Sequence, residues 1–459
     1  MQNGYAAITL ARYMANGLTD STFGNNGQVI TQTGQASCVT SLVLQSDHKI
    51  VAAGYTFLND SIYNFTALRY NTDGSPDGTF GNGGIALVDV ENSPYAYNVA
   101  INGSGKIIMS GYSKKNSNIG ISLVQLNSDG TPDTSFGTGG IALHHFGESP
   151  DVEAWAMALQ ADGKIVTAGL IYDVLLDYNK IAVIRFDVNG SLDTTFGAGG
   201  ISKISVSSGS ANHDDFANAI AIQPDGRIVI AGDAYIWPIT HFALLRLTDT
   251  GALDTTFGSG GIVITDIGNS ENSAYGVNIQ ADGKIIAVGE CRDTTVSGGG
   301  NFALARYNYD GSPDMTFGNS GKVYTDIGGH DDYAYCVKEQ ADGKLIVSGI
   351  SKGSIYYNFA IARYNGVSTS LPEYKREENF KIFPNPAVNK IAVTGLNNGI
   401  IDIYNIQGQC IKTCYISNTY TIIDVSELST GVYFIKVSAD KIMSASKQEI
   451  AVMKFVKKL

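Results

Sequence analysis

The sequence is poor in the features that mark disulfide-bonded, metal-binding or membrane-spanning proteins. Its five cysteines are an odd number and none are spaced as Cys-x-x-Cys, so neither a disulfide framework nor a thiolate metal site is expected. Cys410 and Cys414 could pair across a local turn, but two small half-buried residues are the favoured interpretation. No apolar run is long enough to cross a bilayer, so no transmembrane segment is expected.

Positive charge is also scarce. The chain of 459 residues has 31 Lys and Arg against 43 Asp and Glu, a formal net charge of -12. Nucleic-acid phosphates and anionic membrane surfaces attract clustered positive charge, so neither is an expected partner. Tryptophan is limited to two residues, whereas Gly reaches 53 and Tyr 25. With short alternating apolar runs, this composition favours an all-β protein with many tight turns.

A Phe-Gly pair recurs at nearly constant spacing through the first 364 residues. The intervals are 57, 56, 60, 61 and 60 residues, between Phe23, Phe80, Phe136, Phe196, Phe257 and Phe317. Six copies of one unit predict a stacked or closed array of supersecondary units, rather than a single-site enzyme domain.

Each unit contains four short strand patterns separated by turns. In the copy after Phe257 they cover residues 262–266, 274–279, 285–289 and 301–307, and an Asp-Gly-Lys hairpin turn joins the second to the third. Four antiparallel strands in each unit predict an all-β fold, a β-propeller of six complete four-stranded blades. Residues 5–13 are a stray last strand, which either pairs with a sheet edge or belongs to a seventh blade of the full-length protein.

The recurring phrases are Asp-Gly-Lys-Ile-Ile-Val-Ala-Gly, Phe-Ala-Leu-Ala-Arg-Tyr-Asn and Leu-Asp-Thr-Thr-Phe-Gly, with small variations between copies. In fixed order over residues 5–364, they resemble the delta-60 repeat family of bacterial proteins, understood as a β-propeller. The resemblance implies a propeller domain over residues 1–364 and no particular chemistry.

A second domain is expected after a linker. Residues 365–379 combine Ser, Thr and Pro with a charged run and predict the linker. Residues 380–459 read as a small sandwich of short strands. Their motifs, in order, include Pro384, Asn385, Pro386, Gly408, Leu428, Gly431, Tyr433, Lys457 and Lys458. This pattern resembles the C-terminal sorting domain of the type IX secretion system of Bacteroidetes.

That resemblance implies export across the outer membrane by the type IX secretion machinery, removal of the domain, and release or attachment at the cell surface. Clients of this machinery also need an inner-membrane signal peptide. Residues 1–13 lack the basic start and apolar core of one. We therefore expect the natural product to begin before Met1, which the upstream genomic sequence can test.

Two recurring charged residues are interpreted as architectural. An Asp stands three residues before each Phe of the repeat. Each copy offers too few oxygen ligands for calcium, so we expect the Asp to accept backbone N–H bonds in a turn. An Arg recurs in the last strand of every unit except at Gln125, and we expect it to join neighbouring blades through carbonyls or the turn carboxylates. No metal site and no cofactor is expected, with calcium at these turns as the alternative.

One face of the propeller gathers the candidate ligand-binding residues. The register nine residues after each Phe carries carboxylates and an imidazole, and the loops that follow carry two His-Asp-Asp runs. If the strand after each Phe-Gly lines the central channel, these residues lie near its mouth. Loops between the third and fourth strands emerge on the same face and are rich in aromatic rings. The candidates are His213, Asp214, His330, Asp331, Asp89, His145, Asp266, Asp326, Tyr235 and Trp237. A solvated acidic loop is the alternative interpretation.

Aromatic rings beside carboxylates can hold sugars, which favours a secreted or surface-attached module that binds glycan, a protein or another extracellular polymer. No catalytic residue is assigned, because the sequence has no Ser-His-Asp order, no phosphate-binding loop and no His-x-x-x-His motif. An enzyme is therefore the less favoured class. The alternatives are a glycoside hydrolase or polysaccharide lyase that uses propeller carboxylates, and a purely structural protein of a surface layer.

Overall fold

A computed structural model describes residues 6–458 except 60–61, 116–117, 147–150, 208–213, 269–270, 293–298, 354–355, 367–380, 395–398, 406–409, 417, 419 and 440–447. The chain forms two compact units, Met1–Val367 and Ser368–Leu459. Its described residues form strands and turns and no helix, so none of them belongs to a helix that could cross a membrane. Of the expected linker, only residues 365–366 are described.

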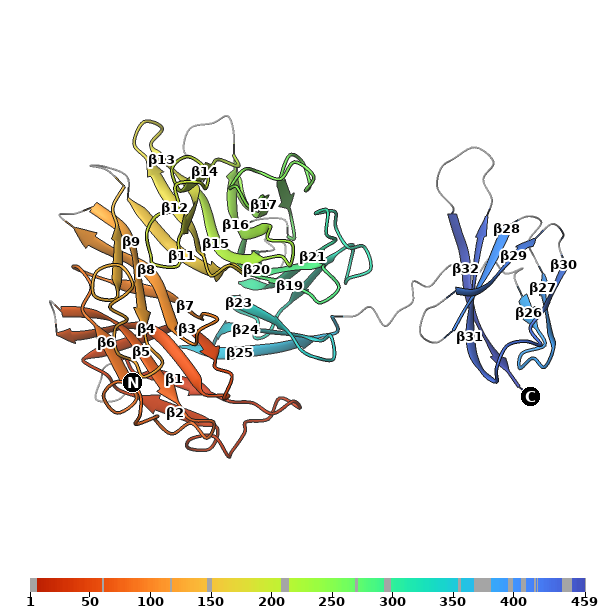
Figure 1. Ribbon diagram of the computed structural model, residues 1–459, viewed down its shortest axis with the longest axis horizontal. Coiled ribbons are helices and arrows are strands. Elements are labelled where there is room, and N and C mark those ends of the chain that lie inside the picture. Colours follow the sequence, from red (N-terminus) through yellow and green to blue (C-terminus); the bar gives the residue numbers. More distant parts are fainter. Residues whose placement is uncertain are drawn as a thin grey trace. The chain divides into compact units, whose positions relative to one another are not determined.

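In the first unit, six antiparallel sheets are arranged around a common axis as propeller blades, which confirms the predicted fold class (Figure 1). Five blades have four strands each. The first contains β3 (Ala36–Leu44), β4 (Ile50–Asn59), β5 (Ile62–Tyr70) and β6 (Ile85–Val88), and the second contains β7 (Tyr95–Ile101), β8 (Ile107–Lys115), β9 (Asn118–Leu126) and β10 (Ile141–His144). The third contains β11 (Val152–Leu159), β12 (Ile165–Asp173), β13 (Tyr178–Phe186) and β14 (Ile201–Ile204), the fourth β15 (Asp215–Ile222), β16 (Ile228–Ile236), β17 (Ile239–Leu247) and β18 (Ile262–Thr265), and the fifth β19 (Asn272–Ile279), β20 (Ile285–Arg292), β21 (Gly300–Tyr307) and β22 (Lys322–Thr325).

The sixth blade has three strands among the described residues, β23 (Asp332–Glu339), β24 (Leu345–Lys352) and β25 (Tyr357–Tyr364), and a separate pair joins β1 (Ile8–Ala11) to β2 (Gln28–Thr31). The sheets are therefore offset from the sequence repeat by one strand. The strand after each Phe-Gly pairs with the last strand of the preceding unit, as β18 pairs with β17. Because β2 pairs with the stray strand β1, each sequence unit still supplies four strands.

The offset corrects one expectation. The strand after each Phe-Gly does not line the central channel, because it is the outer edge of its blade. The strands nearest the axis are β3, β7, β11, β15, β19 and β23 (Figure 1). Periodicity orders the strands along the chain, but it does not say which sheet edge faces the axis.

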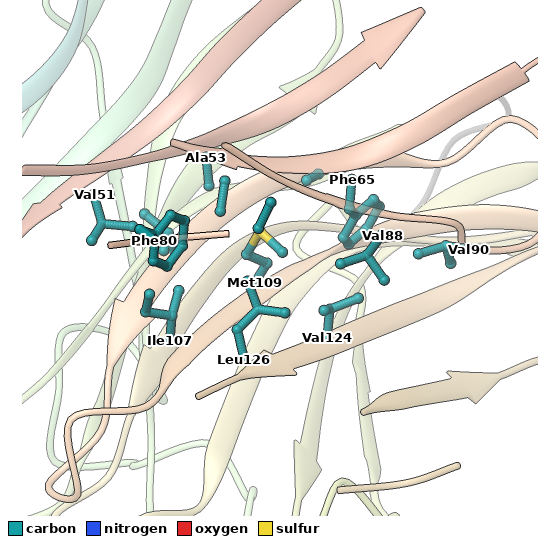
Figure 2. Close-up of a cluster of buried hydrophobic side chains, with 14 residues drawn as sticks. Val51, Ala53, Phe65, Phe80, Val88, Val90, Ile107, Met109, Val124 and Leu126 are labelled. Carbon is teal, nitrogen blue, oxygen red and sulfur yellow. The ribbon is translucent and has the colours of Figure 1, made fainter. Parts of the chain in front are cut away.

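Apolar side chains pack each blade against the next. In the cluster between the first two blades, Val51 of β4, Phe65 of β5 and Phe80 of the Phe-Gly turn meet Met109 of β8 and Val124 of β9 (Figure 2). Corresponding clusters join the later blades. Because each four-stranded blade is covered on both faces, its middle strands are continuous apolar runs rather than alternating ones.

A bulge near the start of each inner strand explains a recurring glycine. In β19 the register shifts between Ala274 and Gly276, which leaves Tyr275 as the extra residue. There the carbonyl of Ser273 approaches Gly289 of β20 so closely that a Cβ on that glycine would lie 1.8 Å from the oxygen. The same close approach occurs at Gly54, Gly111, Gly169, Gly232 and Gly349. Only glycine leaves room for the neighbouring backbone at this point.

The second unit is a small β-sandwich. One sheet contains β26 (Lys381–Phe383), β27 (Lys390–Thr394) and β30 (Tyr420–Asp424), and the other contains β29 (Cys410–Ile416), β28 (Gly399–Tyr404), β31 (Gly431–Ala439) and β32 (Gln448–Lys457). Ile391 and Val393 of the first sheet share a core with Ile401, Ile403 and Ile435 of the second.

The first and last segments of this unit's sequence motifs meet in the sandwich. The Oδ1 of Asn385, in the Pro-Asn-Pro segment, accepts a hydrogen bond of 2.9 Å from the backbone N of Val456, and Ala387 forms a β-bridge with Lys457. The hydroxyl of Tyr433 donates to the carbonyl of Ser429 at 2.8 Å. The start of the domain is thus held against its basic end.

Candidate functional site

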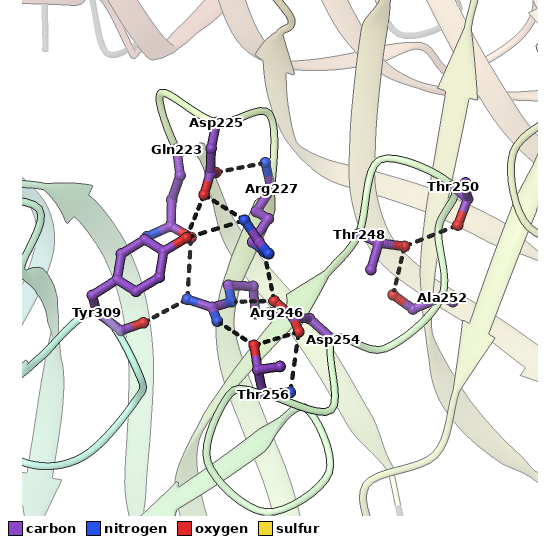
Figure 3. Close-up of polar contacts among 10 residues, drawn as sticks. All are labelled: Gln223, Asp225, Arg227, Arg246, Thr248, Thr250, Ala252, Asp254, Thr256 and Tyr309. Atoms are coloured by element: carbon purple, nitrogen blue, oxygen red, sulfur yellow. Dashed lines mark hydrogen bonds and ion pairs between the residues drawn. The ribbon is translucent and has the colours of Figure 1, made fainter.

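The recurring arginine and aspartate form a joint between blades at the hairpin-turn end of the propeller. Arg246 Nε donates to Asp254 Oδ2 at 2.9 Å, and its Nη1 donates to the carbonyl of Tyr309 in the next blade at 2.5 Å (Figure 3). Asp254 Oδ1 accepts from the backbone N of Thr256 at 3.1 Å, and Arg227 Nε donates to its Oδ2 at 2.7 Å. These contacts confirm the architectural interpretation of both recurring residues.

The joint recurs with a cation from the Asp-Gly-Lys turn in each four-stranded blade. The ion pairs are Lys49–Asp77, Lys106–Asp133, Lys164–Asp193, Arg227–Asp254 and Lys284–Asp314. Burial by itself would raise the pKa of Asp254, but hydrogen bonds from Thr256 and Arg227 outweigh it and lower the pKa to about 2. These carboxylates are therefore engaged by the scaffold, and the site residues expected from the sequence lie at the other end of the propeller, where the longer loops emerge.

Two of the predicted site residues, Asp214 and Asp331, hold the preceding blade at that loop end. Asp214 Oδ1 accepts from the backbone N of Asn179 at 2.8 Å and from its Nδ2 at 2.9 Å. Asp331 Oδ1 accepts from the backbone N of Gly300 at 3.1 Å, and its Oδ2 lies 3.3 Å from Lys352 Nζ. Both carboxylates therefore connect the entry to one blade with the third strand of the blade before it.

Four further candidates follow outer strands of different blades. They are Asp89, His145, Asp266 and Asp326. His145 Nε2 lies 2.8 Å from Glu91 Oε2, and the Asp266 carboxylate hydrogen bonds to His241. Because each of the four follows a separate outer strand, the structure does not bring them together at one centre.

The remaining candidates lie on the loops. His330 lines a pocket of about 540 Å³ beside β25, together with residues 351–353 and 358–361. Trp237 is 74% exposed between β16 and β17, and Tyr235 is half-buried near the end of β16. His213 lies outside the described residues, as does Gly408 of the sorting motif. Nowhere in the described ranges do three His, Cys, Asp or Glu side chains group as metal ligands.

The inner strands carry an aromatic set that the sequence reasoning did not find. Five inner strands have an aromatic residue next to an alanine near their start, and in two of them, Tyr95-Ala-Tyr97 and Tyr333-Ala-Tyr335, a ring stands on each side of it. This repeated pattern was the available signal. We define the inner aromatic set as these inner-strand rings together with two rings of second strands that touch Tyr95, Tyr55 of β4 and Tyr112 of β8. Its members are Tyr55, Tyr95, Tyr97, Tyr112, Trp155, Phe216, Tyr275, Tyr333 and Tyr335. Rings of neighbouring blades touch, at centroid distances of 4.7 Å for Tyr55–Tyr95, 5.5 Å for Trp155–Phe216 and 5.4 Å for Tyr275–Tyr335.

Carboxyl groups lie among these rings. Glu290 Oε1 accepts a hydrogen bond of 2.9 Å from the hydroxyl of Tyr275. Asp233 is buried, and its Oδ1 accepts from the backbone N of Ala274 in the next blade at 3.0 Å. Burial raises the pKa of Glu290, and it raises the pKa of Asp233 to about 7.

Glu153 repeats this combination of ring and carboxyl in another blade. Its Oε2 accepts a hydrogen bond of 2.8 Å from Trp155 Nε1, and burial raises its pKa. The inner aromatic set and these carboxyls combine flat apolar faces with hydrogen-bond acceptors at the inner edges of several blades. Such a combination suits a ligand that has both apolar faces and hydroxyl groups.

Comparisons with known proteins identify two regions of the chain. Residues 45–80, 103–136, 160–196, 223–257, 280–317 and 340–369 match the family described as a domain of unknown function (DUF5122) beta-propeller. Residues 381–451 match the secretion system C-terminal sorting domain. A search of curated proteins found no match.

Several solved structures are similar in fold. PorZ, described as an essential surface component of the type-IX secretion system of Porphyromonas gingivalis, is 10% identical with a TM-score of 0.33, over 95% of this chain and 62% of PorZ. A protein of unknown function from Dyadobacter fermentans is 11% identical with a TM-score of 0.43, over 71% of this chain and 94% of that one. The β-propeller domain of the Trilobed protease from Pyrococcus furiosus is 11% identical with a TM-score of 0.37, over 92% and 97%. The chain therefore spans less than two thirds of the length of PorZ, and these similarities concern the fold alone.

Proposed function

Because the chain joins a DUF5122 β-propeller region to a secretion system C-terminal sorting domain, we propose that it is a secreted module that binds a glycan or another extracellular polymer. The sorting domain supports secretion and attachment at the cell surface. The single observation that supports binding is the inner aromatic set with its hydrogen-bonded carboxyls. Rings in this arrangement stack on the C–H faces of a sugar, and carboxyl oxygens accept bonds from its hydroxyls.

The loop end of the propeller is the proposed binding face. The rings of Trp155 and Tyr335 are the primary contacts, because they lie on inner strands and each touches a ring of a neighbouring blade. Trp237 and Tyr235 extend this face over the loop between β16 and β17. Asp214, Asp331 and the carboxyls after the outer strands support the loops or add contacts around the rings.

A glycan array probed with the full chain, followed by calorimetry on the best binder, tests the proposal. Trp155→Ala and Tyr335→Ala should each weaken binding by about tenfold or more, as removal of a central aromatic contact does. Tyr415→Ala is the matched control, because that ring is exposed in the sorting domain. If binding survives both inner-strand changes and is lost in Trp237→Ala, the site lies on the loop between β16 and β17. If none of the three changes affects binding, the choice of face is refuted.

A glycoside hydrolase is the second candidate, favoured by one observation. Glu290 and Asp233 both have raised pKa values, and Glu290 is hydrogen bonded to Tyr275. A hydrolase needs a carboxylic acid that stays protonated near neutral pH. Release of reducing sugar from an array-positive polymer, lost in Glu290→Gln, would establish the enzyme. Binding without any product supports the module.

We also propose the type IX secretion machinery as a partner, from the match of residues 381–451. Expression in a bacterium that carries this machinery, with an inner-membrane signal peptide fused before Met1 and with and without residues 380–459, tests the role of the sorting domain. The full chain should reach the medium or the cell surface, whereas the shortened chain should stay inside the cell. Equal export of both forms would contradict the proposal.

A further inference from the structure

The β1–β2 pair occupies a seventh position in the propeller. Each recurring arginine donates to a carbonyl of the next blade that lies three residues after that blade's own recurring position. Arg185 and Arg246 reach Asp249 and Tyr309 in this way. Arg363 of the sixth blade donates to the carbonyl of Ala15 at 2.6 Å, three residues after Arg12. The half-blade formed by β1 and β2 therefore follows the sixth blade, and Arg12 in turn donates to Thr72 of the first complete blade.

This half-blade contains the third and fourth strands of a blade, and its first two strands have no counterpart among the described residues. Elsewhere these two strands cover the preceding blade, as β23 and β24 cover Phe302 and Leu304 of β21, both 0% exposed. The residues at the same positions of β25 are Phe359 and Ile361, which are 60% and 46% exposed. An apolar face that is buried in the other blades is thus uncovered here. Among the described strands β1 pairs only with β2, which leaves its other hydrogen-bonding edge beside this face without a partner strand.

A carboxylate at the same position lacks its usual cation. Asp20 is bonded to Arg12 Nε at 2.9 Å as the other turn aspartates are bonded to their arginines. In the four-stranded blades the aspartate also pairs with a Lys or Arg from the turn between the first and second strands of its own blade. The side chain of Asp20 is 22% exposed, compared with 5% for Asp254. Hydrogen bonds from Thr22 hold the pKa of Asp20 below its usual value, so the carboxylate is charged at neutral pH.

We propose that this position is a docking slot for a β-hairpin of the repeat's own type. The first strand of the hairpin covers Phe359 and Ile361, its turn places a lysine or arginine at Asp20, and its second strand pairs with the free edge of β1. The apolar face, the strand edge without a partner among the described residues, and the carboxylate that lacks its second cation specify this occupant, because the complete blades satisfy the same three features with one such hairpin. Strand addition at an exposed edge is an established mode of peptide recognition.

The chain supplies its own probe. A synthetic peptide of residues 152–173 contains β11, the turn with Lys164, and β12, and it contains no cysteine. Labelled with fluorescein, it can be titrated with the full-length chain and followed by fluorescence anisotropy. A scrambled peptide of the same composition is the control for nonspecific apolar binding.

We expect the native peptide to bind saturably and the scrambled peptide not to bind. Phe359→Ser and Ile361→Ser should each weaken binding by about tenfold or more, since each removes a central apolar contact. Both side chains are largely exposed in the chain alone, so these changes should leave the circular dichroism spectrum unchanged. Tyr415→Ser is the matched control for an exposed ring and should bind as the unaltered chain does.

The ionic contact has its own test. Asp20→Asn and a peptide with Lys164→Gln should each reduce affinity several-fold, and the two together should cost no more than either alone, because both remove the same pair. The proposal would be overturned if the chain bound the native and scrambled peptides with equal affinity. It would also be overturned if the unaltered chain, Phe359→Ser and Asp20→Asn all bound the native peptide with equal affinity. Self-association of the chain that Phe359→Ser abolishes would also overturn it, because the slot would then belong to a second copy.

Discussion

Arg246 and Arg12 occupy the same position of the repeat in different surroundings. The side chain of Arg246 is 1% exposed, whereas that of Arg12 is 34% exposed. At the corresponding position of another blade, Gln125 keeps a contact to Asp133 with its Nε2 at 2.5 Å. The fold therefore tolerates glutamine at this position, which makes Arg→Gln a conservative probe of the joint.

Arg246→Gln should destabilise the propeller by about 2–4 kcal/mol, because it leaves Asp254 and a carbonyl of the next blade short of a buried charged partner. Arg12→Gln should cost less than about 1 kcal/mol, since that ion pair is solvated. Urea unfolding followed by tyrosine and tryptophan fluorescence measures both. Equal effects of the two changes would show that burial does not set the strength of the joint.

The raised pKa of Asp233 predicts how the stability of the propeller depends on pH. Its pKa rises from 3.8 to about 7 on folding, first because of burial, so the folded state favours the protonated form. The stability it contributes is fully present below about pH 4 and is lost as pH rises through about 7. Asp233→Asn should therefore flatten the change of unfolding free energy between about pH 4.5 and 7.5, measured by urea titration.

The turn aspartates supply the internal control for this experiment. The pKa of Asp254 is lowered to about 2, so its contribution is present above its unfolded pKa and is lost only as pH falls toward 2. The loss of unfolding free energy below about pH 4 should therefore be the same in Asp233→Asn and in the unaltered chain. Glu153 and Glu290, whose pKa values are also raised by burial, contribute to the same slope and are unchanged in the variant. A neutral-range slope as steep in the variant as in the unaltered chain would contradict the assignment to Asp233.

At the scale of the element, the inner-strand bulge and its facing glycine act together. Gly289→Ala should destabilise the propeller by about 2 kcal/mol or more, because the new methyl group would overlap the carbonyl of Ser273 and force the backbone apart. Gly103→Ala is the matched control, since nothing lies within 4 Å of a Cβ built there, and it should have little effect. Thermal unfolding of both variants provides the measurement, and equal shifts would show that the contact with the bulge is not the cause.

At the scale of the whole molecule, the two compact units should unfold separately. Each hydrophobic cluster of the described residues lies entirely within one unit. Val347→Ala should reduce the unfolding free energy of the propeller alone, and Ile435→Ala that of the sorting domain alone, each by about 2–4 kcal/mol. In calorimetry, each change should lower the temperature of one transition and leave the other where it was. A single transition that both changes shift equally would show that the units are thermodynamically coupled.

The sequence by itself determined the repeat, the number of strands in each unit, the hairpin turns and the sorting domain. Local chemistry was sufficient for these features, because Gly and Asp specify turns and apolar runs specify buried strands. It also predicted the role of the recurring Arg and Asp, since a contact that serves every blade must recur in every unit.

Only the tertiary structure decided which edge of each sheet faces the axis. A strand such as β18 has the same local pattern whether it pairs with β17 before it or β19 after it, so its place depends on long-range pairing. That choice put Asp89, Asp266 and Asp326 after outer strands. It likewise put the inner aromatic set near the axis and left Phe359 uncovered. Sequence periodicity describes the neighbours of a residue along the chain, whereas both candidate sites depend on the packing between blades.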